Sequence, residues 1–225
     1  MEKIKTSLSR RSFLKSSMLA SGGLMISFSG LAKSISDGNI NPSNLAEEWN
    51  ELTGYIKITS DNIIKIFNPN PEFGQNVMTS LPMIVAEELD VDWKKVIVEM
   101  GPHDNAKLGP QFTGGSNSVR MYWKPLREAG AAARQMLRDA AAQTWSVPVE
   151  EVTTKAGMLY HEKSGKTGKY GDFASKAAAN PIPKEVKLKE IKSFNVVGNS
   201  SKNVEGLKIV TGKPLFALDH KYEGM

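Results

Sequence analysis

The sequence predicts a layered α+β fold, with a βαβ-like core over residues 53–146 followed by a small mixed region. Three observations support this fold class. Two segments rich in β-branched residues flank a short turn and indicate a β-hairpin. An amphipathic pattern over residues 77–89 then precedes an apolar run at 96–98, the order of a strand-helix-strand crossover. An alanine-rich helix expected over residues 117–145 supplies a second packing layer.

The elements follow one another without a long gap after the first 52 residues. Residues 33–52 are polar and turn-rich, and we expect a linker there with a short helix from about Leu45 to Trp49. The hairpin runs from Tyr55 to Phe67 around the turn Ser60-Asp61-Asn62. It ends at Asn68-Pro69-Asn70-Pro71, because two closely spaced prolines interrupt regular structure.

Glu87 and Glu88 are adjacent near the end of the predicted helix 77–89. Neighbouring helical residues diverge by about 100°. We therefore expect these carboxylates at a solvated helix end rather than acting together on one substrate atom. The run 96–98 is expected to be a buried strand, and a long loop over residues 101–115 leads to the alanine-rich helix. Pro125 should bend this helix or mark where a looser first segment meets the main helix.

The last third of the chain predicts strands at 152–154 and 157–161, a turn at 163–169 and a helix at 172–179. The turn contains Ser164-Gly165-Lys166-Thr167, which is similar to the end of a phosphate-binding P-loop. A P-loop needs a glycine where this chain has Tyr160, and a long helix afterwards, so we interpret the segment as a hairpin tip. Residues 184–225 are expected to be extended, with strand-like stretches at 196–197, 207–210 and 215–218.

Charge and cysteine content exclude several classes of function. The formal net charge is +5, but residues 1–32 carry five Lys/Arg and one Glu, which leaves 24 basic against 23 acidic residues, or +1. No stretch interleaves basic and aromatic residues, so nucleic acid is not an expected partner. The absence of cysteine excludes a disulfide, a thiolate zinc site and an iron-sulfur cluster within the chain. His103, His161 and His220 are expected at surface or turn positions rather than as metal ligands.

Residues 1–32 are typical of an export signal. Five cationic residues precede the apolar stretch Ser16 to Ala32, which is too short and too polar to predict a membrane anchor. Ser9 to Lys15 matches the twin-arginine motif, and the alternative is a general secretory leader with adjacent arginines. Because the twin-arginine route carries folded proteins, the leader favours a periplasmic or otherwise exported protein with a cofactor, and the twin-arginine export machinery as a partner.

The stretch Phe112 to Ser118, FTGGSNS, directly precedes the longest predicted helix. Unpaired N–H groups and the helix dipole make such a position suitable for an anion, and Gly114 and Gly115 admit close backbone approach. The same residues also suit a flexible hinge. The sequence therefore leaves a phosphate site and a hinge as two interpretations of this loop.

Several blocks in the same order resemble one known family. Residues 55–219 resemble the N-terminal portion of the large, molybdopterin-binding subunit of the xanthine dehydrogenase family, in the branch of the isoquinoline 1-oxidoreductase beta subunits. Agreement of separate blocks is more specific than any single glycine motif. The matching blocks are Pro71 to Gln75, Thr79 to Trp93, Thr113 to Ser116, Pro125 to Arg134 and Thr211 to Asp219.

The resemblance implies a molybdopterin-binding-type domain at residues 53–183, followed by a linker and the truncated start of a hammerhead-like domain at 184–225. It implies a cofactor of the molybdopterin cytosine dinucleotide type and hydroxylation of N-heterocycles or aldehydes with oxygen from water. A separate small iron-sulfur subunit and the remainder of the large subunit are the implied partners. The implied cofactor-binding residues are Gly74, Gln75, Thr113, Gly114, Gly115 and Ser116.

The chain also departs from the family. Asn76 stands where the family has glycine, and Asn117 stands where threonine is more usual. The catalytic glutamate of the family lies beyond the last residue here, so no catalytic residue is assigned and the chain alone is expected to be inactive. Two other functions stay open: a non-catalytic periplasmic binding module, and a small hydrolase using His103, Asp104 and Ser116.

Overall fold

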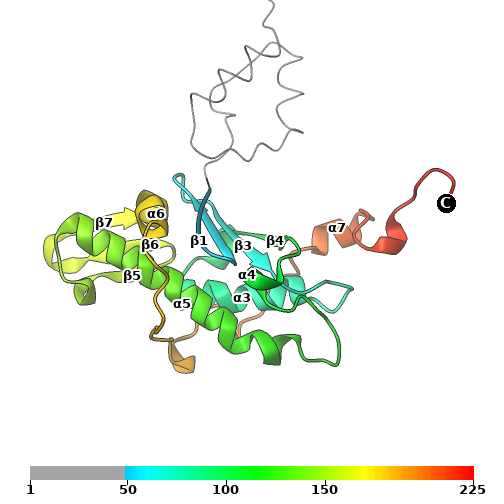
Figure 1. Ribbon diagram of the computed structural model, residues 1–225, viewed down its shortest axis with the longest axis horizontal. Coiled ribbons are helices and arrows are strands. Elements are labelled where there is room, and N and C mark those ends of the chain that lie inside the picture. The colour runs from blue at the N-terminus through cyan, green and yellow to red at the C-terminus, as the bar shows by residue number, and fades with distance from the viewer. Residues whose placement is uncertain (1–48) are drawn as a thin grey trace, which may run out of the picture. The chain divides into compact units, whose positions relative to one another are not determined.

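Four strands form the larger of two sheets in the computed structural model, which describes residues 49–225 (Figure 1). The strands β1 (Trp49–Thr53), β2 (Ile56–Thr59) and β3 (Ile64–Asn68) are antiparallel neighbours. Strand β4 (Val96–Met100) lies parallel to β3, because helix α3 (Val77–Leu89) carries the chain back across the sheet between them. The predicted hairpin and the strand-helix-strand core are thus confirmed.

Two expectations at the margins of this sheet are wrong. Residues from Trp49 to Thr53 form strand β1 and pair with β2, where the sequence indicated a helix end and a linker. Strand β4 is half-exposed rather than buried, since it is the edge strand of the sheet and Ile97 faces solvent. The predicted leader, and residues 33–48 of the predicted linker, lie outside the described residues.

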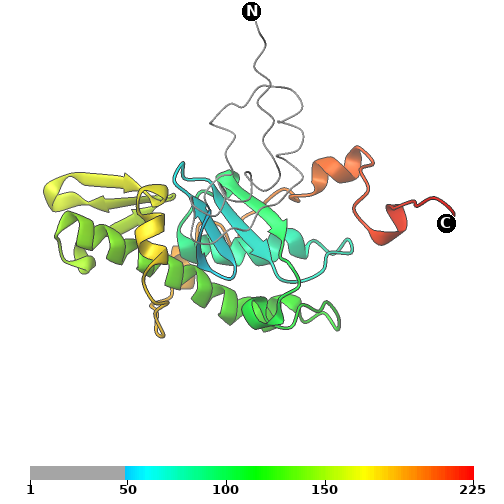
Figure 2. The ribbon, with the colours of Figure 1, turned by 45° about the horizontal axis from the view of Figure 1, so that its top comes forward.

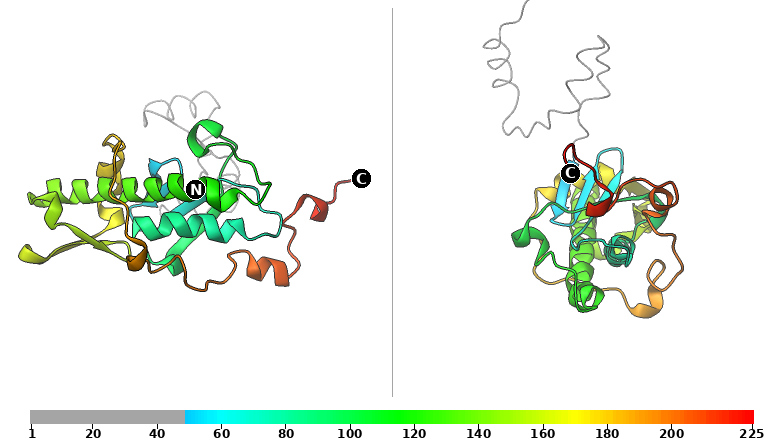
Figure 3. Two further views of the ribbon diagram at one scale, coloured as in Figure 1. Left: turned by 90° about the horizontal axis from the view of Figure 1, so that it is seen from below. Right: turned by 90° about the vertical axis from the view of Figure 1, so that its right-hand side faces the viewer.

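Helix α5 (Ser118–Trp145) packs lengthwise against α3, and the two helices lie side by side along the sheet (Figure 3). Their close approach depends on Gly130, where an added Cβ would lie 2.6 Å from the backbone oxygen of Val85. Pro125 lies within α5, which continues as one helix through it. The face of α5 that enters the core is formed by Tyr122, Leu126, Ala133, Met136, Leu137, Ala140 and Ala141.

The smaller sheet is an antiparallel meander of β5 (Thr153–Lys155), β6 (Met158–His161) and β7 (Lys166–Lys169). Helix α6 (Tyr170–Ala178) follows and lies between the two sheets (Figure 2). Its first residues fit tightly, because a Cβ on Gly171 would lie 2.4 Å from the backbone oxygen of Ser60. These elements confirm the two strands and the small helix expected from the sequence, but the expected turn at 163–169 is shorter, because Lys166–Lys169 form strand β7.

His161 lies at a turn, one of the two positions expected from the sequence, but it is buried rather than at the surface. Its ring nitrogens lie 2.6 Å from Ser164 Oγ and 2.8 Å from a carboxylate oxygen of Glu151. Lys163 also donates to Glu151, and Lys163 and then His161 lower the pKa of that carboxyl. The three side chains close the 162–165 turn, so they serve as its internal hydrogen-bonding network.

The C-terminal region is less extended than predicted. Residues Gly206–Val210 form helix α7 instead of a strand, and residues 196–197 and 215–216 belong to no strand. A further short helix, α4 (Asn105–Leu108), interrupts the predicted 101–115 loop. Short 3-10 helices occur at Trp93–Lys95 (η2), Val149–Glu151 (η3), Glu162–Ser164 (η4), Ile191–Ser193 (η5) and Ala217–Asp219 (η6).

Glu87 and Glu88 are buried, with 1% and 0% of their surface exposed, so their predicted position at a solvated helix end is wrong. Glu88 forms salt bridges with Arg127 at 2.7 Å and Arg134 at 3.6 Å. Glu87 receives hydrogen bonds from the segment that follows α6 and η5. Because buried carboxylates need such partners, the two glutamates tie α5 and the C-terminal segment to α3.

Within residues 49–225, no helix has both the length and the apolar composition needed to cross a bilayer. Nor does this part of the chain contain a group of three or more His, Cys, Asp or Glu side chains able to hold a metal ion.

Candidate functional site

Two loops meet at the end of the sheet where α3 and α5 begin. We call them the 70–76 loop, between β3 and α3, and the 112–118 loop, before α5. Buried Asn70 joins them, because its Nδ2 donates to Phe112 O and to Ser118 Oγ, both at 2.9 Å. The sequence indicated only a structure-breaking role for this asparagine, since nothing local marks its contacts 42 and 48 residues away.

Gln75 and Thr113 converge on one atom. Gln75 Nε2 donates to Pro71 O at 3.2 Å, and Thr113 Oγ1 donates to the same oxygen at 2.8 Å. The structure thus brings together two of the residues that the resemblance marked as cofactor-binding. The Gln75 side chain is also held by its own loop, since its Oε1 accepts from Phe73 N at 2.8 Å.

Glu72 caps the start of α3. Its carboxylate accepts from the N–H groups of Gly74 at 2.7 Å, Asn76 at 2.9 Å and Met78 at 2.9 Å. A carboxylate at a helix N-terminus pairs with the free amides and the positive end of the dipole. At the start of α3 itself, an anion of the chain thus already holds the Met78 amide, and the Asn76 carbonyl oxygen accepts from Thr79 N.

Asn76 stands where the family has glycine, and its backbone keeps a conformation that glycine adopts easily. It adopts the left-handed region, with φ 72°, and Gly74 nearby has φ 109°. Asparagine tolerates this region better than most residues. Its Oδ1 also accepts from Thr79 Oγ1 at 2.6 Å, so the side chain is turned toward α3.

The start of α5 contrasts with that of α3. Gly115 and Ser116 are both left-handed, with φ 59° and 55°, and Asn117 makes no side-chain capping bond. Its Oδ1 instead accepts from Arg120, at 2.8 Å to one guanidinium nitrogen. Among the described residues, no hydrogen bond uses the N–H groups of Ser118, Val119 or Arg120. Unpaired amide donors are thus available at this helix start.

The two glycines of the 112–118 loop differ in what they accommodate. A Cβ on Gly114 would lie 2.6 Å from the Phe112 ring, so this glycine makes room for an exposed aromatic side chain. A Cβ on Gly115 would meet only Asn117, with Nδ2 nearest at 3.1 Å. Another residue at Gly115 is therefore constrained by the positive φ and by the nearby Asn117 side chain.

Two tyrosines hold the segment that leads into this loop. Tyr55 Oη donates to Leu108 O at 3.0 Å, and Tyr122 Oη lies 3.2 Å from the same oxygen and 2.9 Å from Pro110 O. Burial, with a smaller contribution from Tyr122, raises the pKa of Tyr55 to about 12. Burial also raises the pKa of Tyr122. Both hydroxyls stay protonated donors at neutral pH, which keeps the approach to the loop in place.

Apolar side chains and a small cavity surround the joined loops. Phe73 is 63% exposed and Phe112 70% exposed. A cavity of about 320 Å³ lies beside the 70–76 loop and is bounded on its far side by residues 203–216. The alternative hydrolase arrangement does not form among the described residues, because Asp104 caps α4 and no hydrogen bond joins His103 to Ser116.

One family profile and several known proteins are similar to this chain. The profile of a family described as "Molybdopterin cofactor-binding domain" matches residues 26–210. The chain is 28% identical to the beta subunit of isoquinoline 1-oxidoreductase from Brevundimonas diminuta, covering 76% of this chain and 27% of that protein. It is 30% identical to a membrane-bound aldehyde dehydrogenase [pyrroloquinoline-quinone] of Gluconacetobacter polyoxogenes, covering 98% and 29%.

Two further matches come from Pseudomonas putida. One subunit of nicotinate dehydrogenase is 28% identical, over 78% of this chain and 15% of that protein. The crystal structure of quinoline 2-oxidoreductase superposes with a TM-score of 0.45 at 15% identity, over 59% of this chain and 17% of that one. The chain thus spans between 15% and 29% of the length of the curated relatives it matches.

Proposed function

Because the chain belongs to the molybdopterin cofactor-binding domain family, we propose that it is the N-terminal part of the cofactor-binding subunit of an exported molybdenum hydroxylase. Its relatives are named for isoquinoline, nicotinate and aldehydes, so the proposed substrate class is N-heterocycles or aldehydes. Export by the twin-arginine route is part of the proposal and rests on Arg10 and Arg11 in the leader.

One observation carries the proposed cofactor site: unpaired amides at the start of α5 beside the left-handed pair Gly115 and Ser116. Successive N–H groups in such a turn form an anion-binding concavity, and the helix dipole adds to it. The start of α3 is a weaker candidate, because the Glu72 carboxylate already accepts from Asn76 N and Met78 N there and would repel a phosphate. The fit therefore favours a phosphate-bearing cofactor at the 112–118 loop.

The proposed holding residues are Gly74, Gln75, Thr113, Gly114, Gly115 and Ser116. Gln75 and Thr113 both donate to the Pro71 carbonyl oxygen, which would hold the side-chain amide and hydroxyl beside the cofactor. Gly115 would let the backbone approach a diphosphate, since it carries no Cβ on its open side. When bound, the cofactor supplies the metal centre at which a carbon of the substrate is oxidised. These residues would position the cofactor and exclude water from it. None of them is a base at neutral pH, so the chain alone is proposed to be inactive.

We propose the molybdopterin cytosine dinucleotide form of the cofactor, because a diphosphate matches the free amides at α5. The iron-sulfur clusters are assigned to a separate small subunit, since this chain has no cysteine to bind them. One relative is named for pyrroloquinoline quinone instead. That quinone carries no phosphate, so metal analysis of the purified protein separates the two assignments.

The test compares Gly115→Val with Gly165→Val in the assembly purified from the cells that make it. Both glycines have positive φ, 59° and 67°, so both substitutions strain the backbone similarly. Gly165 lies at the tip of the smaller sheet with no atom within 4 Å of an added Cβ. We expect Gly115→Val to lower bound molybdenum roughly tenfold, about 1.4 kcal/mol in affinity, and Gly165→Val to retain it.

Equal molybdenum in the two variants would reject the 112–118 loop as the phosphate site. A wild-type assembly free of molybdenum would instead favour the second candidate function, a binding module that keeps the scaffold without catalysis.

A further inference from the structure

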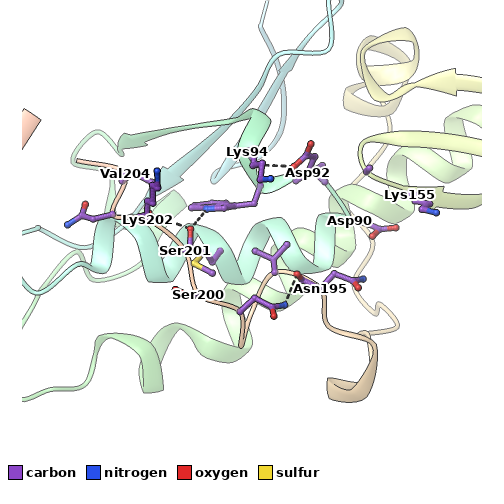
Figure 4. A pocket seen from close by; sticks show the side chains of 16 residues that line it. Asp90, Asp92, Lys94, Lys155, Asn195, Ser200, Ser201, Lys202 and Val204 are labelled. Carbon is purple, nitrogen blue, oxygen red and sulfur yellow. Dashed lines mark hydrogen bonds between the residues drawn. The ribbon is translucent and has the colours of Figure 1, made fainter. Parts of the chain in front are cut away.

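A cleft of about 990 Å³ lies away from the cofactor loops, between the C-terminal half of α3 and residues 187–204, which we call the strap (Figure 4). Its floor is mainly apolar and includes Met83, Val91 and Trp93. The strap supplies the opposite wall with residues 195–196 and 199–204. Asp90 and Lys94 mark the part of the floor beyond the end of α3.

The strap is anchored at several points, so the cleft is preformed. Glu87 Oε2 accepts from three successive N–H groups, those of Asn195, Val196 and Val197, at 2.9, 2.6 and 3.1 Å. Trp93 Nε1 donates to Ser201 Oγ at 2.7 Å. Val204 N donates to Thr79 Oγ1 at 3.1 Å, which holds the far end of the strap on α3.

Both acidic groups of the cleft have hydrogen-bond partners within the chain, and Asp90 also forms a salt bridge. Asp90 Oδ1 lies 2.8 Å from Lys189 Nζ, and Asp90 Oδ2 accepts from Thr154 Oγ1 at 2.7 Å. Asp92 caps η2 by accepting from Lys94 N at 3.1 Å. Neither Asp90 nor Asp92 therefore forms a salt bridge with the lysine side chains at the rim of the cleft.

The lysines of the rim are not paired. Lys94, Lys155 and Lys202 are exposed, and none of them forms a salt bridge with any residue in the range 49–225. They come from three separate elements, η2, β5 and the strap. Figure 4 shows Lys202 and Lys155 toward opposite ends of the cleft, with Lys94 between them. The cleft thus offers a row of free cations along an apolar floor.

We propose that this cleft binds an extended acidic segment of a partner subunit, with one apolar side chain against Trp93 and carboxylates on Lys94, Lys155 and Lys202. A single small anion would satisfy one end of such a row, whereas a peptide with spaced carboxylates matches all of it. Tryptophan in a preformed apolar site is a frequent anchor at protein interfaces. This inference rests on the proposed function in one respect, that the chain works together with a second subunit. Two relatives are themselves named as subunits of enzymes.

Carbodiimide treatment of the purified assembly tests the contact directly, because the reagent joins lysine amines to carboxylates that touch them. Mass spectrometry should find links from Lys94, Lys155 or Lys202 to Asp or Glu of the partner chain. Lys184, Lys213 and Lys221 are exposed lysines outside the cleft and serve as internal references. Links from the reference lysines alone, or none to a partner, would overturn the proposal.

Charge reversal gives a second measurement. The triple variant Lys94→Glu, Lys155→Glu, Lys202→Glu should lower the amount of partner retained by at least roughly tenfold. Lys184→Glu, Lys213→Glu, Lys221→Glu changes the net charge equally and should retain it. Equal loss in both variants would show a nonspecific charge effect and reject the cleft. Molybdenum content is measured in the same samples, so failure of this contact is distinguished from failure of the cofactor site.

Discussion

The carbonyl oxygen of Leu108 accepts hydrogen bonds from two tyrosines that lie 67 residues apart in the chain, Tyr55 and Tyr122. Each hydroxyl replaces a water molecule that the carbonyl would otherwise bind, and a buried phenol keeps its proton more firmly than an exposed one. Through this one oxygen, Tyr55 just before strand β2 and Tyr122 of helix α5 are both joined to the segment that precedes the 112–118 loop. Single side chains therefore decide where the proposed cofactor loop lies.

Alkaline pH should weaken this junction. The pKa of Tyr55 is raised from 10.0 to about 12 in the folded chain, mainly by burial. A group with a raised folded pKa contributes stability that is complete below pH 10.0 and is lost as the pH rises toward about 12. Allowing for partial exposure, we expect wild type to lose about 1 kcal/mol more than Tyr55→Phe over this interval.

Urea unfolding followed by circular dichroism at a series of pH values measures that difference. Tyr222→Phe, which changes a 74% exposed tyrosine, is the control and should follow wild type. If Tyr55→Phe and wild type lose stability in parallel above pH 10, the protonated Tyr55 hydroxyl does not support the fold.

At the scale of elements, the contact between α3 and α5 organises the molecule. Gly130 lies where the two helices come closest, and alanines on either side of it keep the helix surface smooth. The buried Glu88 of α3 forms salt bridges with Arg127 and Arg134, which lie in α5 like Gly130. Close packing and charge pairing together hold the starts of both helices, and hence both loops of the candidate site, in one register.

Gly130→Ala should destabilise the fold by about 1–3 kcal/mol, because the added methyl would lie 2.6 Å from Val85 O and 2.9 Å from Glu88 Cβ. Gly206→Ala is the matched control, since it adds the same methyl to helix α7 with no atom nearer than 3.8 Å. The control should be neutral or stabilising by up to about 1 kcal/mol. Urea unfolding midpoints measure both, and equal effects would contradict the close helix contact.

At the scale of the whole described molecule, the strap connects regions that are far apart in the sequence. Glu87 accepts backbone N–H groups 108 to 110 residues away, and Thr79 accepts from Val204, 125 residues away. Phe194 and Val197 of the strap make apolar contacts, and these polar anchors add to them in keeping the strap on α3. They also keep the walls of the lysine-rimmed cleft and of the cavity beside the 70–76 loop in place.

Glu87→Gln should release the strap while leaving the sheet and helices folded. The neutral amide presents one acceptor oxygen with no charge to three N–H groups, which weakens charge-assisted bonds that are worth about 1.5–3 kcal/mol. Trypsin should therefore cleave after Lys192 and Lys202 roughly tenfold faster than in wild type.

Glu99→Gln is the control for that digestion, because Glu99 is a half-exposed glutamate that forms its salt bridge with Lys65 of β3 and not with the strap. Cleavage rates that rise equally in both variants would indicate general destabilisation. Unchanged rates in Glu87→Gln would show that the strap is held by contacts other than this carboxylate.

Local patterns in the sequence were sufficient for the hairpin and for helices α3 and α5, because each follows from residue spacing within a few turns or a few strand positions. They also placed a hairpin tip within residues 163–169, although strand β7 already begins at Lys166. The blocks shared with a known family also marked Gln75 and Thr113, which lie on one carbonyl oxygen. Short-range periodicity carries no information on distant partners. Tertiary packing alone decided that Glu87, Glu88 and His161 are buried, that Asn70 joins the two loops, and that residues 49–53 extend the sheet, since each depends on groups supplied from elsewhere in the chain.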